Sequence, residues 1–154
     1  MGDYIHNKLQ ALDWNNSTSV QLEAIQAIVE DDAFDPVLLL QKNIPKECWG
    51  NASIILTKWG SPRIDAIIPG LFAWLQDINW PGALEILVLL YDLPEEKTAK
   101  PLQDAIAEAK RTNDTAWLEF IEYFTNRDEY EQENRCWLEN HRRLIADAFG
   151  GIYP

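Results

Sequence analysis

Residues 74–94 read WLQDINWPGALEILVLLYDLP, and this stretch decides the fold of the chain. Its second half is apolar nearly all round, because Glu85 is the one charged residue between Ala83 and Tyr91. A helix with this pattern is buried on most of its sides. We therefore expect a helix over these residues at the centre of the core, with the other helices packed around it.

The first half of the stretch predicts a corner between two helices. Its apolar residues follow helical spacing up to residue 78, and Pro81 suits the first turn of the next helix. Asn79 or Trp80 would cap that helix, and Asp77 and Asn79 are side chains that satisfy backbone groups at tight turns. The alternative is a polar ligand site flanked by tryptophans. The predicted structural turn comprises Trp74, Asp77, Asn79, Trp80 and Pro81.

The remainder of the chain also predicts helices, and no segment alternates convincingly with period two. Pro69 and Gly70 predict a kink or break inside one of these helices, because proline removes a backbone hydrogen bond. The fold class is therefore all-α. The expected helices cover residues 4–12, 19–30, 36–41, 45–59, 62–78, 81–93, 101–111, 115–125 and 127–149.

Tryptophans recur at long intervals along the chain. Trp14, Trp49, Trp80 and Trp117 are separated by 35, 31 and 37 residues, and each lies near the start of the second helix of an expected pair. Such periods are typical of α-solenoids, although amphipathic helices also resemble one another by chance. We predict a single repeat domain over 1–154, with about four helix pairs and a C-terminal helix over 127–149. Helical spacing assigns the tryptophans to the core, with Trp59 as an exception at the surface.

The string WLQDINWPGA at residues 74–83, with a later segment at 114–117, resembles a bacterial family of uncharacterised domains related to HEAT repeats. The resemblance covers about residues 59–125, which leaves the terminal helices outside it. It implies a short HEAT-like solenoid that serves as a scaffold or, as in some bacterial relatives, as an immunity protein that neutralises a toxin. The resemblance implies no established activity.

The chain is strongly acidic, with a net charge of −12 from 25 acidic and 13 basic residues. A field of this sign repels phosphate backbones, so nucleic acid is not an expected partner. The first residues have neither the basic nor the apolar region of a signal peptide, and the longest apolar run is far too short to span a membrane. We expect a cytoplasmic protein without contact with membranes.

The reactive side chains form no recognisable catalytic or metal-binding set. Cys48 and Cys136 have no paired spacing, so we expect two buried free thiols, although one disulfide is the alternative. His6 and His141 lack partners at metal-binding spacing, and His141 falls on the apolar face of the last helix, where a packed histidine is expected. The sequence predicts neither metal nor cofactor.

These observations favour a non-catalytic protein-binding module, of immunity or scaffold type, whose partner is a basic protein. An acidic run at the start of the last helix is the expected docking patch, although a solvated surface is the simpler reading. The competing function is an enzyme that uses the concave face of a HEAT-like fold, for DNA repair or chromophore attachment. The docking residues are Asp128, Glu129, Glu131 and Glu133.

Overall fold

The computed structural model describes residues 2–148 of the chain, with the side chains of residues 2–141 and 143. These residues form helices and turns without a strand, which confirms the all-α class. The α-helices are α1 (Gly2–Gln10), α2 (Thr18–Val29), α3 (Trp49–Trp59), α4 (Ile68–Ala73), α5 (Ala83–Tyr91), α6 (Glu95–Arg111), α7 (Thr115–Thr125) and α8 (Arg127–Ala148). Short 3-10 turns lie at η1 (Pro36–Leu39), η2 (Gln41–Asn43), η3 (Lys46–Cys48), η4 (Asp65–Ile67) and η5 (Trp74–Gln76).

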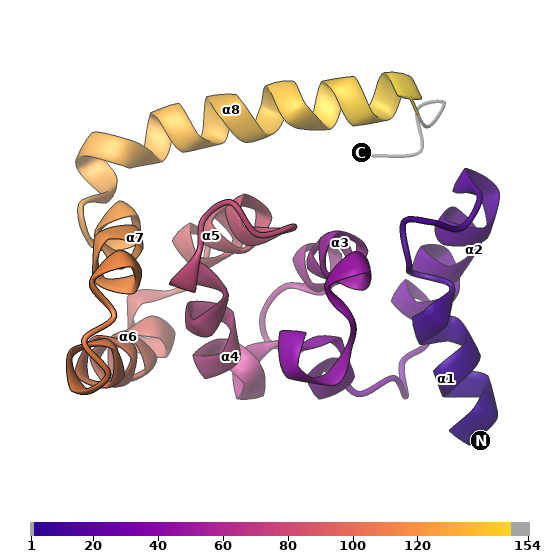
Figure 1. The fold of residues 1–154 in the computed structure, drawn as a ribbon, viewed down its shortest axis with the longest axis horizontal. Coiled ribbons are helices and arrows are strands. Elements are labelled where there is room, and N and C mark those ends of the chain that lie inside the picture. The colour runs from indigo at the N-terminus through magenta and orange to yellow at the C-terminus, as the bar shows by residue number, and fades with distance from the viewer. Residues whose placement is uncertain (1, 149–154) are drawn as a thin grey trace.

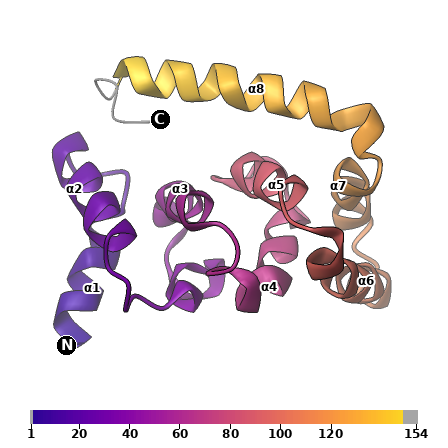
Figure 2. The same cartoon turned by 180° about the vertical axis from the view of Figure 1, so that it is seen from behind.

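The helices lie in two layers with α8 across one of them. Helices α2, α3, α5 and α7 follow one another in the upper layer of Figure 1, and α1, α4 and α6 lie below them. Contacts join neighbouring helices within a layer, such as α3 with α5 and α4 with α6. The last helix, α8, turns back from α7 and runs along the upper layer toward α2 (Figures 1 and 2).

Helix α5 forms the centre of the core, as its apolar sequence predicts. Seven of its nine residues are buried, and they face α3 on one side and α7 and α8 on others. The two that are partly exposed are Leu84 and Glu85. Burying an aliphatic side chain of this size contributes roughly 1.5–3 kcal/mol, so α5 supplies a large share of the driving force for folding.

The corner before α5 is a turn built around a glycine. Gly82 has φ of 82°, and a Cβ at this position would lie 2.6 Å from Oγ of Ser53, so a side chain is excluded by conformation and by space. The indole N–H of Trp74 donates to the Pro81 carbonyl at 2.9 Å, and the Asp77 carboxylate accepts from the Asn79 N–H at 2.8 Å. The predicted turn is therefore structural at these residues, but the cap is Gly82 rather than Asn79 or Trp80.

Two prolines act differently from the expectation. Pro69 stands in the first turn of α4, where proline is tolerated, so the break falls before it, in the turns between residues 60 and 67. Pro101 lies inside α6, which begins at Glu95 rather than at the proline. Glu95 and Glu96 occupy the first turn of α6, where acidic side chains complement the helix dipole.

Helix α8 is joined to α5 by a cluster of polar contacts. Arg127 donates to the Tyr91 carbonyl at 2.7 Å and Arg135 donates to the Asp92 carboxylate at 2.8 Å. Both arginines also bond Glu131, at 3.0 and 2.9 Å. Leu138 is 2% exposed and is the apolar anchor further along the helix. Position 149, the expected end of this helix, lies outside the described residues.

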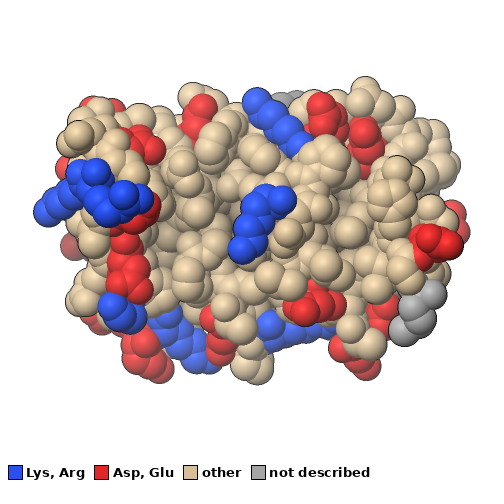
Figure 3. All heavy atoms as spheres, turned by 60° about the horizontal axis from the view of Figure 1, so that its bottom comes forward, with Lys and Arg blue, Asp and Glu red and all other residues tan. Residues whose placement is uncertain are grey.

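Within the described residues, no helix is both long enough and apolar enough to cross a membrane. The charged side chains are dispersed over the surface. On the face shown in Figure 3, acidic side chains extend from one end to the other, with basic side chains among them and wide uncharged areas between. On this face the acidity is therefore spread along the molecule and not confined to one end.

Candidate functional site

The seven tryptophans divide into two groups by what their indole N–H groups do. Four of them donate to backbone carbonyl oxygens at 2.9–3.1 Å: Trp49 to Ile44, Trp59 to Val29, Trp74 to Pro81 and Trp117 to Phe72. The indole N–H groups of the other three make no hydrogen bond to any described residue, and these are Trp14, Trp80 and Trp137. The N–H of a buried tryptophan normally has a hydrogen-bond partner, so the second group does not show the bonding that is expected of core tryptophans.

These three tryptophans line one cleft of about 440 Å³. Trp14 precedes α2, Trp80 lies in the turn before α5, and Trp137 lies on α8. The cleft is therefore formed where α8 passes over α3 and α5 (Figure 1). Trp14 and Trp137 are 50% and 51% exposed, whereas Trp80 is partly buried and packs edge-on against Trp49 at 5.4 Å. The expectation that the tryptophans are core residues is wrong for Trp14 and Trp137.

His141 also lines the cleft, and its environment differs from the expectation. Its ring stacks on that of Trp137 at 5.0 Å, with 14° between the planes, and the side chain is exposed. Helical periodicity assigned Trp137, Leu138 and His141 to one apolar face. Adjacent residues lie about 100° apart around a helix, and the fold buries Leu138 and leaves Trp137 outside.

Two buried amides at the base of the cleft hold each other in a fixed orientation. Gln21 donates through Nε2 to the carbonyls of Trp14 and Asn16, at 3.1 and 2.8 Å. Its Oε1 then accepts from Nδ2 of Asn51, which also donates to the Leu12 carbonyl at 2.7 Å. Since both partners of Nδ2 are acceptors, the amide orientation of Asn51 is determined by the network.

This network leaves the side-chain carbonyl oxygen of Asn51 without a hydrogen-bond donor among the described residues. Asn51 is 8% exposed and lines the cleft, and its Oδ1 accepts no hydrogen bond from the described residues. Ser53, also in the lining, is fully buried and donates to the Gly50 carbonyl. The cleft thus offers an unpartnered acceptor beside three indole rings.

The charge of the lining is acidic. Glu85 contributes a carboxylate, and among the described residues that line the cleft none is lysine or arginine. Of the predicted turn, the cleft includes Asn79, Trp80 and Pro81, while Trp74 and Asp77 serve the turn itself. The predicted structural role therefore applies to Trp74 and Asp77, and the alternative of a ligand site applies to the residues that line the cleft.

The predicted acidic docking patch at the start of α8 contains two kinds of side chain. Asp128, Glu129 and Glu133 are exposed. Glu131 is bound by Arg127 and Arg135, and their hydrogen bonds hold the pKa of its carboxyl below the usual value. Glu131 therefore fastens α8 to α5, and the three exposed carboxylates remain as candidates for docking.

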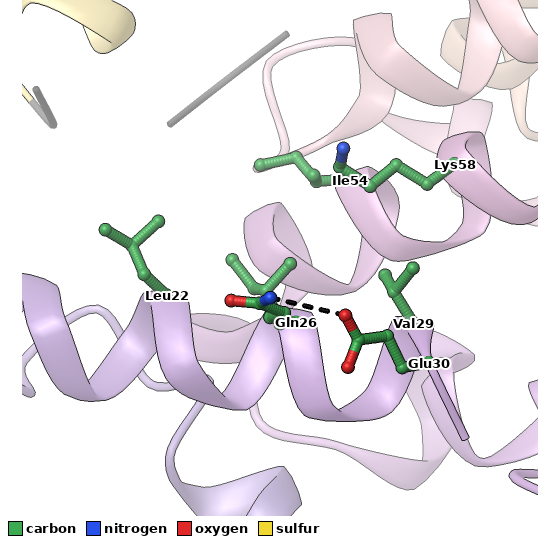
Figure 4. A pocket seen from close by; sticks show the side chains of 7 residues that line it. Leu22, Gln26, Val29, Glu30, Ile54 and Lys58 are labelled. Atoms are coloured by element: carbon green, nitrogen blue, oxygen red, sulfur yellow. Dashed lines mark hydrogen bonds between the residues drawn. The ribbon is translucent and has the colours of Figure 1, made fainter. Parts of the chain in front are cut away.

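Other hollows also lie among the described residues, and two of them have features of interest. A groove of about 340 Å³ lies between α2 and α3, where Leu22, Val29 and Ile54 form an aliphatic floor (Figure 4). On its rim Gln26 donates to Glu30 at 3.2 Å. A hollow of about 600 Å³ is lined by Gln41, whose buried Nε2 has no hydrogen-bond partner among the described residues.

Neither cysteine lines the cleft. Both cysteines are free; Cys48 is buried as expected, whereas Cys136 is exposed. Burial, with help from Asp13 and Glu47, raises the pKa of the Cys48 thiol to about 11, so it is protonated at neutral pH. Within the described part of the chain, no three His, Cys, Asp or Glu side chains form a group that suits a metal ion.

Comparison with known proteins places the chain in a family. No curated protein and no solved structure was found to match it. A family model matches residues 45–148, a longer range than the expected 59–125. The match includes α3 and α8. Trp80 and Trp137 therefore fall within it, and Trp14 falls before it. The family is described as Domain of unknown function (DUF5071), its model covers more than half of the chain, and the chain therefore belongs to it.

Proposed function

We propose that this chain is a non-catalytic protein-binding module whose contact site is the tryptophan-lined cleft. The observation that carries the proposal is the division of the tryptophans, since those whose indole N–H has no hydrogen-bond partner among the described residues gather at one cleft. Tryptophan is enriched at the centres of protein–protein interfaces, where one ring supplies a large apolar area and one donor. Exposed aromatic side chains that converge in a hollow are therefore a mark of recognition.

The architecture that we propose for the module is a short HEAT-like stack. Apart from α2 and α3, which both lie in the upper layer, consecutive helices alternate between two layers, and the chain advances from one end of the molecule to the other before α8 turns back. Stacked helix pairs form extended surfaces on which binding residues from distant parts of the sequence meet. Trp14, Trp80 and Trp137 would be such a set.

We propose a basic partner in the bacterial cytoplasm. A net charge of −12 favours association with a cationic protein. An exposed free thiol at Cys136 suits a reducing compartment. Two kinds of module fit this charge. One is an immunity protein that covers a cationic nuclease toxin, and the other is a scaffold for a basic protein.

Site-specific photo-crosslinking in the native cells tests the function. A photoreactive phenylalanine analogue replaces Trp137, and a second variant carries it at Lys100, an exposed residue on α6. The proposal predicts one protein crosslinked from position 137 and not from position 100. No protein adduct from position 137, together with a small molecule that the chain turns over, would favour the enzyme alternative.

A further inference from the structure

We propose that the cleft binds an arginine side chain in an extended basic segment of the partner protein. The inference rests on the proposed binding function and assigns the chemistry that the site recognises. Two features of the cleft carry it, the faces of the tryptophans and the unpartnered carbonyl of Asn51, together with the net charge of −12, which favours a cationic guest.

The aromatic rings supply faces for a flat cation. Trp is the best ring for cation–π contact, and a guanidinium also stacks on it as a plane. Trp14 and Trp137 are half exposed, so their rings accept a guest without unfolding any of the core. A peptide chain that brings such a side chain also brings backbone carbonyls, which are acceptors for the free indole N–H groups.

The Asn51 carbonyl supplies the directional contact. It is held in place by the hydrogen bonds among Asn51, Gln21 and three backbone carbonyls, so no ordering cost arises when a donor arrives. A guanidinium has five N–H donors and no acceptor, which matches the acceptor-only oxygen of Asn51. A neutral amide guest would satisfy the oxygen but would gain no cation–π attraction from the tryptophan rings.

The chain already contains one arginine bound in this manner. The guanidinium carbon of Arg63 lies 3.7 Å from the ring centroid of Trp59. The same group donates to the carbonyls of Asp31 and Phe34, at 2.6 and 3.1 Å. Stacking on tryptophan combined with donation to carbonyl oxygens is thus a geometry that this molecule uses within its own fold.

Two-dimensional NMR of the indole N–H groups tests the inference. The probes are acetyl-Gly-Arg-Gly-Arg-Gly-amide, the same peptide with citrulline in place of arginine, and the neutral sugar maltotriose. Citrulline keeps the shape and several donors of arginine but has no charge. The inference predicts that the arginine peptide shifts the indole signals of Trp14, Trp80 and Trp137. The four tryptophans bonded to backbone carbonyls should not respond.

Binding should depend on charge and on Trp137. Affinity for the arginine peptide should exceed that for the citrulline peptide by about fivefold at low salt and fall as salt is added. Trp137→Leu should weaken binding by about fivefold, since it removes an exposed ring without opening the core. Tyr4→Leu is the matched control, because Tyr4 is 51% exposed and lies outside the cleft lining.

Several outcomes would overturn the inference. Equal binding of the citrulline peptide, shifts at the internally bonded indoles, or maltotriose binding without peptide binding would each do so. No shift with either peptide would also overturn it. The protein-binding function is judged separately by the crosslinking at position 137, so a crosslinked partner without arginine dependence would reject this inference and leave the function standing.

Discussion

Each tryptophan of this chain either finds an acceptor inside the fold or keeps its N–H toward water. Trp74 is fully buried and donates to the Pro81 carbonyl, so it closes the corner before α5. Trp80, six residues later, is partly buried, and its indole N–H donates to no described residue. The two tryptophans that bracket the predicted turn therefore serve different purposes: one holds the corner together, and the other forms the wall of a cleft.

Alanine substitutions should separate these roles. Trp74→Ala removes a fully buried ring and a hydrogen bond, and we expect it to lower the free energy of unfolding by about 3–5 kcal/mol. Trp80→Ala should cost about 1–3 kcal/mol, and Trp137→Ala less than about 1 kcal/mol. Urea denaturation followed by circular dichroism measures all three. Equal losses for Trp74 and Trp137 would contradict the division of the tryptophans.

Two glutamines provide a second comparison at the residue scale. Gln21 makes hydrogen bonds through both ends of its amide, whereas Nε2 of Gln41 is buried without a partner among the described residues. Gln21→Met leaves several polar groups unpaired and should cost at least about 2 kcal/mol. Gln41→Met removes an unpaired donor and should raise stability by about 1 kcal/mol. Thermal denaturation of both variants checks the sign, and destabilisation by Gln41→Met would show that its amide has a partner in solution.

At the scale of the element, α8 is held to α5 by charge as much as by apolar contact. The side chains of Arg127, Glu131 and Arg135 are 30–40% exposed, so solvent screens their attraction, but together they fix where the helix lies. Trp137 and His141 reach the cleft from this helix. The position of α8 therefore determines whether the cleft exists.

Acid should loosen α8. The folded-state pKa of Glu131 is lowered by its arginine partners, so its contribution to stability is present above the ordinary value of 4.5 and is lost as the pH falls through the lowered value. We expect the protection of α8 amides against hydrogen exchange, relative to the intrinsic rate at each pH, to fall between about pH 5 and pH 3 more than that of α3. Glu131→Gln should quicken exchange at neutral pH and remove much of this pH dependence. An unchanged pH profile in that variant would place the titrating group elsewhere.

The spacing of apolar residues predicted helices correctly where one face or all faces of the helix are apolar. The predicted helix start was wrong where it depended mainly on a proline. Helix α5 was predicted from its apolar composition, but the predicted helix, from Pro81 to just before Pro94, is longer than the observed Ala83–Tyr91. The start of α6 was missed because Pro101 was taken for a helix start, although the residues from Glu95 onward complete its first turns. Local sequence does not distinguish a proline that opens a helix from one accommodated within it.

At the scale of the whole molecule, the cleft joins three segments that are far apart in the sequence. The turn residues Asn79, Trp80 and Pro81 were singled out from the sequence, but their partners in the cleft were not. Trp14 and Trp137 lie in otherwise polar stretches, which was the available signal for exposure. Trp14 and Trp137 lie in one cleft because α8 folds back over α3 and α5. The spacing of apolar residues within a helix does not indicate where that helix packs.

The acidity of the whole molecule leads to a prediction about association rates. With a net charge of −12, the chain should bind a basic partner through electrostatic steering, and the association rate should fall steeply with added salt. The probe is the protein crosslinked from position 137, and stopped-flow tryptophan fluorescence measures its association. The exposed carboxylates at the start of α8 allow local docking to be separated from the general field.

Two charge-matched variants make this separation. Glu129→Gln with Glu133→Gln neutralises exposed residues of α8 and spares Glu131, whereas Glu23→Gln with Asp32→Asn neutralises exposed residues in or near α2. If the start of α8 is a docking patch, the first pair should slow association at low salt by about two- to fivefold, and the second should slow it less. At high salt the variants should converge, because screening removes the difference. Equal slowing by both pairs would assign the steering to net charge alone, and an association rate indifferent to salt would contradict electrostatic recognition of the partner.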